Sequence, residues 1–305
     1  MTASFGEALR GQVRAWVMHA FPRPAAGGGI DYDQPAGDPG LFDPDGVAWR
    51  VHADFPGMLS GGLCALMLQT LHPAALAGVW DHSNFRDDLV GRLRRTTDFV
   101  AGTSYAPVAE AQRQVDRVRR IHSKVRGVTE SGAPYSADDP ALLTWVHVTE
   151  AYGFLQGYRR FAGPVPRDAA DRYYDETRVI AERLGATDVP RSEAQVEAYL
   201  VQVQPQLAYT DRSRAVLDVL SRMRLPVPLP GLSRDVFLGA GAALLPAWAS
   251  ALLRRTPGDA IRAGIGARSL KAMAPVFRAA LNDGPAQRAC ARMGIDPARL
   301  RRGFS

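Results

Sequence analysis

The sequence predicts an all-α fold. Its 305 residues are 46% hydrophobic and 22% charged, an ordinary globular composition that excludes a disordered, collagen-like or coiled-coil chain. From residue 58 onward, apolar residues recur at helical spacing in one segment after another, whereas stretches that alternate apolar and polar residues are scarce. Together these observations favour helices packed around a hydrophobic core.

The chain divides into a lead-in and one domain. Residues 1–46 are expected to form a loop-rich segment with one short helix, because residues 23–47 are rich in Pro, Gly and Asp. Residues 47–305 are expected to form a single all-α domain. The proline-containing breaks at 164–166 and 225–230 are too short to require a second domain.

Most of the domain reads as helix. Residues 58–71 are apolar nearly all round and predict a buried helix that Pro73 kinks or ends. Ser83 or Asn84 is expected to cap a second helix that runs to residue 101. An N-cap aspartate followed by a first-turn proline predicts a helix over 140–161. Further helices are expected at 108–125, 166–184, 192–204, 210–223, 233–253, 258–280 and 285–293.

The charge balance gives no indication of a nucleic-acid partner. The formal net charge is +6, from 37 basic and 31 acidic residues. All basic residues except Lys124 and Lys271 are arginines, a skew that we attribute to a GC-rich bacterial genome. No basic block carries the interleaved aromatic residues that a single-strand binder needs. We therefore expect no nucleic-acid binding.

Several classes of site are excluded by missing motifs. Cys64 and Cys290 lie far apart and no CxxC or Cys/His cluster is present, which argues against a zinc finger, an iron–sulfur cluster or a disulfide scaffold. The HExxH motif, the GxSxG motif and the phosphate-binding glycine loops are absent as well.

Two uncharged stretches raise the question of a membrane. Residues 55–80 and 236–253 contain no Asp, Glu, Lys or Arg. Both are interrupted by proline, and the first also holds Gln69 and His72, so we interpret them as buried core helices rather than spans. Peripheral membrane contact stays open. The first 22 residues lack a long apolar run, so we expect no signal peptide and a cytoplasmic protein.

Arg92 lies beside an apolar helix face. Phe85, Leu89 and Leu93 form the apolar stripe of the second expected helix, and Arg92 and Thr96 flank it at positions i and i+4. A buried arginine needs an anion, because an unpaired buried charge is costly. That anion is either an Asp or Glu of the chain or a carboxylate of a ligand or cofactor.

His122 shares the inward face of its expected helix with Val115 and Val118. Arg119 and Arg126 lie at i−3 and i+4, and their charges are expected to lower the histidine pKa and keep the imidazole neutral, as a metal requires. A hydrogen-bonded core histidine is the other interpretation.

Two more histidines point inward. His147 lies on the apolar face of the 140–161 helix, with Glu150 one turn further on, and His72 precedes Pro73. Three histidines on three expected helices can form a metal site or can simply pack in the core, and the sequence does not fix their distances. The remaining histidines, His19, His52 and His82, are expected to be less buried.

Ordered motifs across about two hundred residues resemble a known family. The chain is similar to the family DUF2236, which includes the MpaB oxygenases and the rubber-cleaving latex clearing proteins. A weaker similarity continues to about residue 250. The similarity is carried by Val47–Arg50, Gly62–Pro73, His82–Phe85, Arg92–Thr96, Val118–Gly127 and Gly132–His147.

The resemblance implies a globin-like helical domain with a buried b-type haem. It implies a haem-dependent oxidoreductase, an oxygenase that uses O2 or peroxide on an apolar or aromatic small molecule. An axial imidazole falls on His122, with His147 as the second candidate and His72 as a distal or supporting residue. The hard chemistry would belong to the cofactor, and the protein would supply orientation and electrostatics.

The family's Arg-x-x-Lys-Thr segment falls on Arg92, Arg95 and Thr96. Here arginine replaces lysine at position 95, and a guanidinium stays protonated and is a very poor iron ligand. By the same resemblance Thr96, or His147 if it is not the ligand, would hydrogen-bond the bound oxidant. The haem propionates would be held by Arg92, Arg119 or Arg126.

Three alternatives remain at this stage. The first is a non-catalytic haem-binding or lipophile-binding protein of the same fold. The second is a helical interaction protein in which the histidines only pack, and the third is a non-haem metal site.

Overall fold

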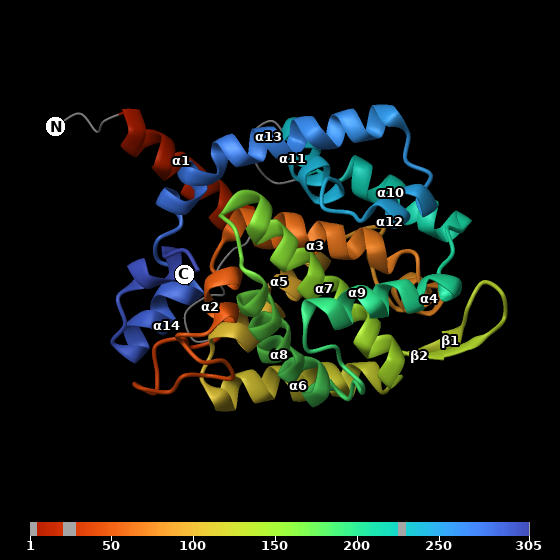
Figure 1. The fold of residues 1–305 in the computed structure, drawn as a ribbon, viewed down its shortest axis with the longest axis horizontal. Coiled ribbons are helices and arrows are strands. Elements are labelled where there is room, and N and C mark those ends of the chain that lie inside the picture. The colour runs from red at the N-terminus through yellow and green to blue at the C-terminus, as the bar shows by residue number, and fades with distance from the viewer. Residues whose placement is uncertain (1–4, 21–28, 225–229, 305) are drawn as a thin grey trace.

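The computed structural model describes residues 5–20, 29–224 and 230–304, and within them it is mainly α-helical (Figure 1). This confirms the all-α class. The α-helices are α1 (Phe5–Ala20), α2 (Val47–His52), α3 (Phe55–Gln69), α4 (Pro73–His82), α5 (Leu89–Tyr105), α6 (Val108–His122), α7 (Pro140–Phe161), α8 (Arg167–Leu184), α9 (Glu193–Gln202), α10 (Asp211–Arg222), α11 (Pro230–Ala242), α12 (Ala247–Leu252), α13 (Pro257–Ala280) and α14 (Pro285–Met293). Short 3-10 helices, η1 (Gln204–Gln206) and η2 (Pro297–Arg301), and two strands, β1 (Arg126–Val128) and β2 (Pro134–Ser136), complete the described fold.

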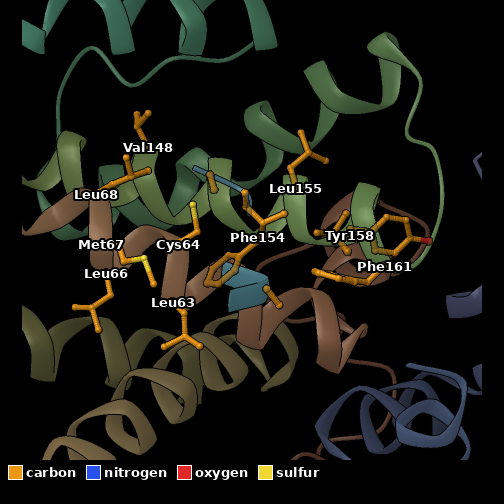
Figure 2. Packing of buried hydrophobic residues seen from close by; sticks show 14 of the residues in the cluster. Leu63, Cys64, Leu66, Met67, Leu68, Val148, Phe154, Leu155, Tyr158 and Phe161 are labelled. Carbon is orange, nitrogen blue, oxygen red and sulfur yellow. The ribbon is translucent and has the colours of Figure 1, made fainter. Parts of the chain in front are cut away.

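Helices α3 and α7 form the centre of the molecule. They pack against each other along most of their length, with α11 and α13 on one side and α8 on the other (Figure 1). Figure 2 shows apolar side chains of α3, such as Cys64 and Leu68, beside those of α7, such as Phe154 and Val148, in one buried cluster. The 55–69 segment carries no charged residue, as expected of a helix that is buried on nearly every face.

Several expected helix boundaries are wrong, and proline explains two of them. Pro73 begins a new helix, α4, because its missing N–H and fixed φ suit the first helical position. Pro246 divides the expected 233–253 helix into α11 and α12 and acts as the N-cap of α12. The cap of α5 is Asp88, which accepts a hydrogen bond from Gly91 N at 2.8 Å, and not Ser83 or Asn84.

A β-hairpin follows α6, where the sequence predicts helix as far as residue 125. Helix α6 ends at His122, and Gly127 pairs with Tyr135 in the antiparallel β1–β2 ladder. Gly132, with φ near +85°, supplies the left-handed residue of the connection. The hairpin projects from the helical body (Figure 1).

Residues 29–46 form no regular helix or strand, and residues 21–28 lie outside the described part. No single helix of the described residues is long and apolar enough to cross a membrane. Helices α3 and α4 reach that length and composition only as a pair, and they are bent by 103° where they meet.

Candidate active site

Polar side chains from four helices lie near one another inside the helical body. They are His52 of α2, Arg92 of α5, His147 and Glu150 of α7, and Tyr173 of α8, and we call them the interior polar cluster. The charge of His147 acts on His52, and the charges of Arg92 and Glu150 act on each other. Glu150 also acts on Tyr173. Titratable groups gathered in a core are a common mark of a functional site.

Local sequence sets two of these helices. Helix α7 begins at Pro140 after the N-cap Asp139, whose carboxylate accepts a hydrogen bond from Leu142 N at 2.9 Å. Its residues His147 and Glu150 are three apart and therefore share one face. Helix α5 begins just before Arg92, so this guanidinium leaves the helix in its first turn.

His52 is held by two hydroxyl groups. Its Nδ1 lies 2.7 Å from Ser104 Oγ and its Nε2 lies 3.0 Å from Tyr173 OH. The ring of Phe154 packs edge-on against it, with 5.6 Å between centroids. Burial above all, together with the charge of His147, lowers the pKa of His52 to about 3. The imidazole is therefore neutral, with one nitrogen donating and the other accepting.

His147 differs from His52 in its hydrogen bonds. Burial lowers its pKa to about 4, so this imidazole is neutral too. Within the described residues, no side chain or backbone group forms a hydrogen bond with its ring. A buried imidazole normally has such a partner. Both ring nitrogens of His147 are therefore available to a bound group.

Glu150 and Arg92 carry the cluster's opposite charges. Burial raises the pKa of Glu150, and the opposing effects of Arg92 and Gln69 leave it at about 7. The Gln69 amide is itself fixed by Thr149 Oγ1 at 3.0 Å. Burial lowers the pKa of Arg92. Among the residues that the structure places, no carboxylate lies within ion-pair distance of the Arg92 guanidinium, so that group can still receive an anion.

His52, Arg92, His147 and Glu150 are surrounded by protein, yet each keeps some solvent-accessible surface. The sequence predicted Arg92 and His147 correctly as inward-facing residues.

The rest of the expected Arg92–Thr96 segment is more exposed. Thr96 lies one turn after Arg92, is exposed, and donates its hydroxyl to the Arg92 carbonyl oxygen at 3.3 Å. Arg95 is also exposed and lies 3.5 Å from the Asp88 carboxylate. Arg95 is therefore paired on the surface and does not belong to the interior polar cluster.

His122 lies at the last residue of α6 and is half-buried. Burial lowers its pKa, and Asp138 opposes the shift, so the arginines expected to depress it are not the cause. Arg126 lies 3.7 Å from Asp138, and Arg119 is exposed. No group within the described part forms a hydrogen bond with the His122 ring. The same part contains no cluster of three or more His, Cys, Asp or Glu residues arranged to hold a metal ion.

His72 occupies the N-cap position of α4 and is half-buried, as expected of an inward residue. Its Nδ1 is buried without a hydrogen-bond partner, and its ring lies 5.8 Å from that of Trp145. Burial lowers its pKa. His72 is therefore a third neutral imidazole with an unused nitrogen.

The sequence interpretation of His52 is wrong, and Tyr173 is missed. His52 was expected to be less buried than the inward histidines, but its ring points into the helical body and is held by Ser104 and Tyr173. The four apolar residues before it, Val47, Ala48, Trp49 and Val51, are all buried. This apolar run indicates a core segment, but it is too short to show which way His52 points. Tyr173 lies on the stripe of Ala169, Ala170 and Thr177, whose spacing predicts a buried helix face.

Comparison with known proteins identifies one family. The sequence model of the ER-bound oxygenase mpaB/B′/rubber oxygenase catalytic domain matches residues 49–279, which is more than half of the chain. The match runs from α2 into α13 and includes every member of the interior polar cluster. No curated protein matches the chain. No solved structure matches it either.

Proposed function

We propose, on the premise that this chain belongs to the MpaB/rubber oxygenase catalytic-domain family, that it is a haem b-dependent oxygenase of an apolar or aromatic small molecule. The family is one of oxygenase catalytic domains, so a small-molecule substrate and O2 follow in general terms. The family match does not establish three further points, which we propose here: the haem, peroxide as an alternative oxidant, and an apolar substrate.

The residues present fit a haem in two respects. A haem iron needs a neutral imidazole with a free nitrogen, and both His122 and His147 meet that requirement. The haem propionates need cationic partners, and Arg92 is an interior guanidinium without a carboxylate at ion-pair distance in the described part. Arg95 does not fit as an iron ligand, because it is a surface cation paired with Asp88.

Following the family resemblance, His122 would hold the haem iron, and His147 is the alternative. When bound, the haem would supply the iron that activates O2 or peroxide. Arg92 would hold a propionate, and Thr96, one turn away on the same helix, would donate a hydrogen bond to the oxidant. If His147 is not the ligand, its free nitrogens can hydrogen-bond the oxidant.

Other residues of the interior polar cluster would orient the His52 ring and hold or release a proton. The hydroxyls of Ser104 and Tyr173 fix the His52 ring beside His147. Glu150, with a pKa of about 7, exists both protonated and ionised near neutral pH and can hold or release a proton at its carboxyl oxygen. Phe154 packs against His52 and adds apolar wall, which suits a substrate with little polarity.

One observation carries the proposal: the interior holds a neutral imidazole without a hydrogen bond, His147, and a guanidinium without a close carboxylate, Arg92. A purely structural cluster would be expected to satisfy both groups with protein partners. A bound anionic cofactor with a ligand-accepting metal satisfies both.

Absorption spectra test the proposal. The protein, expressed with haem supplementation, is expected to be red, with a Soret band that shifts on reduction with dithionite. His122→Ala should abolish or move the band if His122 is the ligand, and His147→Ala should do so if the alternative is correct. His82→Ala, on the exposed end of α4, is the matched control.

Two results would contradict the proposal at different levels. If the wild-type protein stays colourless when haem is present, the protein does not bind haem. A haem protein that cycles between redox states but oxidises no apolar or aromatic compound would instead be a non-catalytic haem-binding or lipophile-binding protein.

A further inference from the structure

A cavity of about 190 Å³ lies where the ends of α2, α7 and α13 meet α14 and η2. None of its lining residues belongs to the interior polar cluster. Its polar lining includes Arg50, Arg278, Arg301 and Tyr158, and its apolar lining includes Phe55 and Phe277. The cavity is thus separate from the proposed haem site in the residues that form it.

Positive charge exceeds negative charge around this cavity. Arg278 is neutralised by Asp54, with Nε 2.5 Å from Oδ1, and also donates to the Phe161 carbonyl at 2.7 Å. Arg301 donates to the Arg278 carbonyl at 2.9 Å. Arg50 lies over the Phe304 ring at 4.2 Å. Within the described part of the chain, neither Arg50 nor Arg301 has a carboxylate at ion-pair distance, so two guanidinium charges are left uncompensated.

The hydroxyl of Tyr158 points to a ligand independently of the charges. Tyr158 is only 6% exposed and lines the cavity, and no group of the described residues forms a hydrogen bond with its hydroxyl. Figure 2 shows that hydroxyl at the end of the packed cluster, directed away from the side chains of α3. Burial raises the pKa of Tyr158, which keeps the hydroxyl a neutral donor. Buried tyrosine hydroxyls normally have a partner.

We propose that this cavity binds a small carboxylate with an aromatic or apolar body. Arg50 and Arg301 would receive the carboxylate, Tyr158 would donate to it, and the ring would lie against Phe55 and Phe277, whose own rings are 5.7 Å apart. The volume is below the roughly 300–1,000 Å³ of pockets for drug-sized ligands, so the ligand is of benzoate size.

The apolar walls favour a carboxylate over a bare inorganic anion. Two aromatic rings offer nothing to a hydrated phosphate, whereas they bury the ring of an aryl acid. The neutral analogue of the same shape lacks the charge that the arginines recognise. Benzoate, inorganic phosphate and benzyl alcohol therefore separate the contributions of ring and charge.

Isothermal titration calorimetry of the full chain with these three probes tests the inference. Benzoate is expected to bind with a stoichiometry near one, and phosphate and benzyl alcohol at least about tenfold more weakly. Arg50→Gln and Arg301→Gln should each weaken benzoate binding about tenfold, and Tyr158→Phe about threefold or more. Arg160→Gln, an exposed arginine of α7, is the control that should leave binding unchanged.

The readout separates this site from the proposed oxygenase. Binding is measured without oxidant or oxidisable substrate, so it stands or falls apart from the haem spectrum. Benzoate binding that survives all three substitutions, or benzyl alcohol binding as tightly as benzoate, would overturn the inference. So would the absence of benzoate binding at millimolar concentration. Tyr158→Phe changes only one oxygen atom, which guards against a result caused by misfolding.

Discussion

His147 and Glu150 lie one turn apart on α7, and burial moves their pKa values in opposite directions. It lowers the pKa of His147 to about 4 and raises that of Glu150 to about 7. Burial disfavours the charged form of each group, and the charged form is the protonated one for histidine and the deprotonated one for glutamate. Near neutral pH, Glu150 is therefore the member of this pair that titrates.

Glu150→Gln is expected to change how stability depends on pH. The pKa of Glu150 in the folded protein, about 7, lies above its ordinary value of 4.5, so the folded state binds the proton more tightly than the unfolded state. The unfolding free energy of the wild type should therefore fall as pH rises from 4.5 to 7. We expect the cofactor-free variant to be more stable above pH 7 by about 1–3 kcal/mol, and the two proteins to converge near pH 4.

Urea denaturation at pH 4.5, 6 and 8 measures this difference. The exposed Glu130→Gln provides a matched change of the same atoms at the surface. A stability gap between wild type and Glu150→Gln that stays constant over the three pH values would show that the buried carboxyl does not titrate in this range.

Sequence periodicity predicted part of the site, because the direction of a side chain on a long helix can be read from neighbouring residues. Arg92 and His147 lie on helix faces whose apolar spacing can be followed over several turns, so their inward direction could be predicted. His52 could not be placed, because α2 has only six residues and less than two turns of pattern. Which of these side chains meet is a property of helix packing, and a single sequence carries no distances between helices.

At the scale of elements, the α3–α7 crossing depends on glycine. Gly57 and Gly61 of α3 lie against Gly157 and Gly153 of α7, and their backbones touch. A Cβ added at Gly61 would lie 2.8 Å from the Cα of Phe154 and closer still to the Gly153 carbonyl. No flexible side chain is present at that point to move aside. The helices would have to separate.

Gly61→Ala is therefore expected to destabilise the protein by about 2–4 kcal/mol or to prevent folding. Gly62→Ala is the matched control, because a Cβ there would meet only Phe154 Cε1 at 3.7 Å, an ordinary contact. The control should be neutral or gain up to about 1 kcal/mol from helix propensity. Thermal unfolding followed by circular dichroism compares them, and equal melting temperatures would contradict the close-crossing account.

The hydrogen bonds of Asp259 at the start of α13 lead to a second prediction about a single element. Asp259 accepts from Thr256 N at 2.8 Å and from Arg262 at 2.6 Å, and these hydrogen bonds, the first above all, lower its pKa to about 2. Since the folded pKa lies below 3.8, the stabilisation is present above about pH 4 and is lost as pH falls toward 2. Asp259→Asn should cost about 1–2 kcal/mol at pH 7 and much less at pH 2.5.

Urea denaturation of wild type and Asp259→Asn at pH 7 and pH 2.5 tests whether the loss of unfolding free energy becomes smaller in acid. Asp218→Asn, which breaks a surface ion pair with Arg222, should cost under about 1 kcal/mol. An Asp259→Asn deficit that grows on acidification would contradict the prediction.

Most helices of the described chain were predicted, but α2 and α4 were not, and several helix ends were wrong. The errors at Pro73 and Pro246 arise because a proline both ends one helix and begins the next, and sequence alone does not decide which role it takes. The β1–β2 hairpin was missed because three-residue strands are too short to show an alternating pattern.

At the scale of the whole molecule, Arg292 fastens the N-terminal loop region to the C-terminal helix. This α14 residue is 5% exposed and donates to the carbonyl oxygens of Tyr32, Asp38 and Tyr105 at 2.7–2.8 Å. Its own carbonyl accepts from Gly37 N at 2.9 Å. Segments more than 180 residues apart are thereby joined through one side chain, which no local pattern in the sequence could reveal.

Arg292→Met is expected to loosen the molecule at this junction. Methionine keeps much of the side-chain volume but donates no hydrogen bonds, so three carbonyl groups lose their donor in a buried place. We expect a loss of about 3–5 kcal/mol. Arg288→Gln, one turn earlier on α14, is the matched control. Arg288 pairs with Asp33 at the surface, so its loss should cost about 1 kcal/mol or less.

Limited proteolysis distinguishes a local opening from a general loss of stability. If Arg292 fixes the loop region, cleavage in the Arg292→Met variant should begin between residues 29 and 46, while the α3–α7 centre stays protected. The Arg288→Gln control loses only a surface contact to the same loop region, so it should be cut there much more slowly than Arg292→Met. Cleavage spread evenly over the chain, or equal melting temperatures for the two variants, would show that Arg292 does not hold these distant segments together.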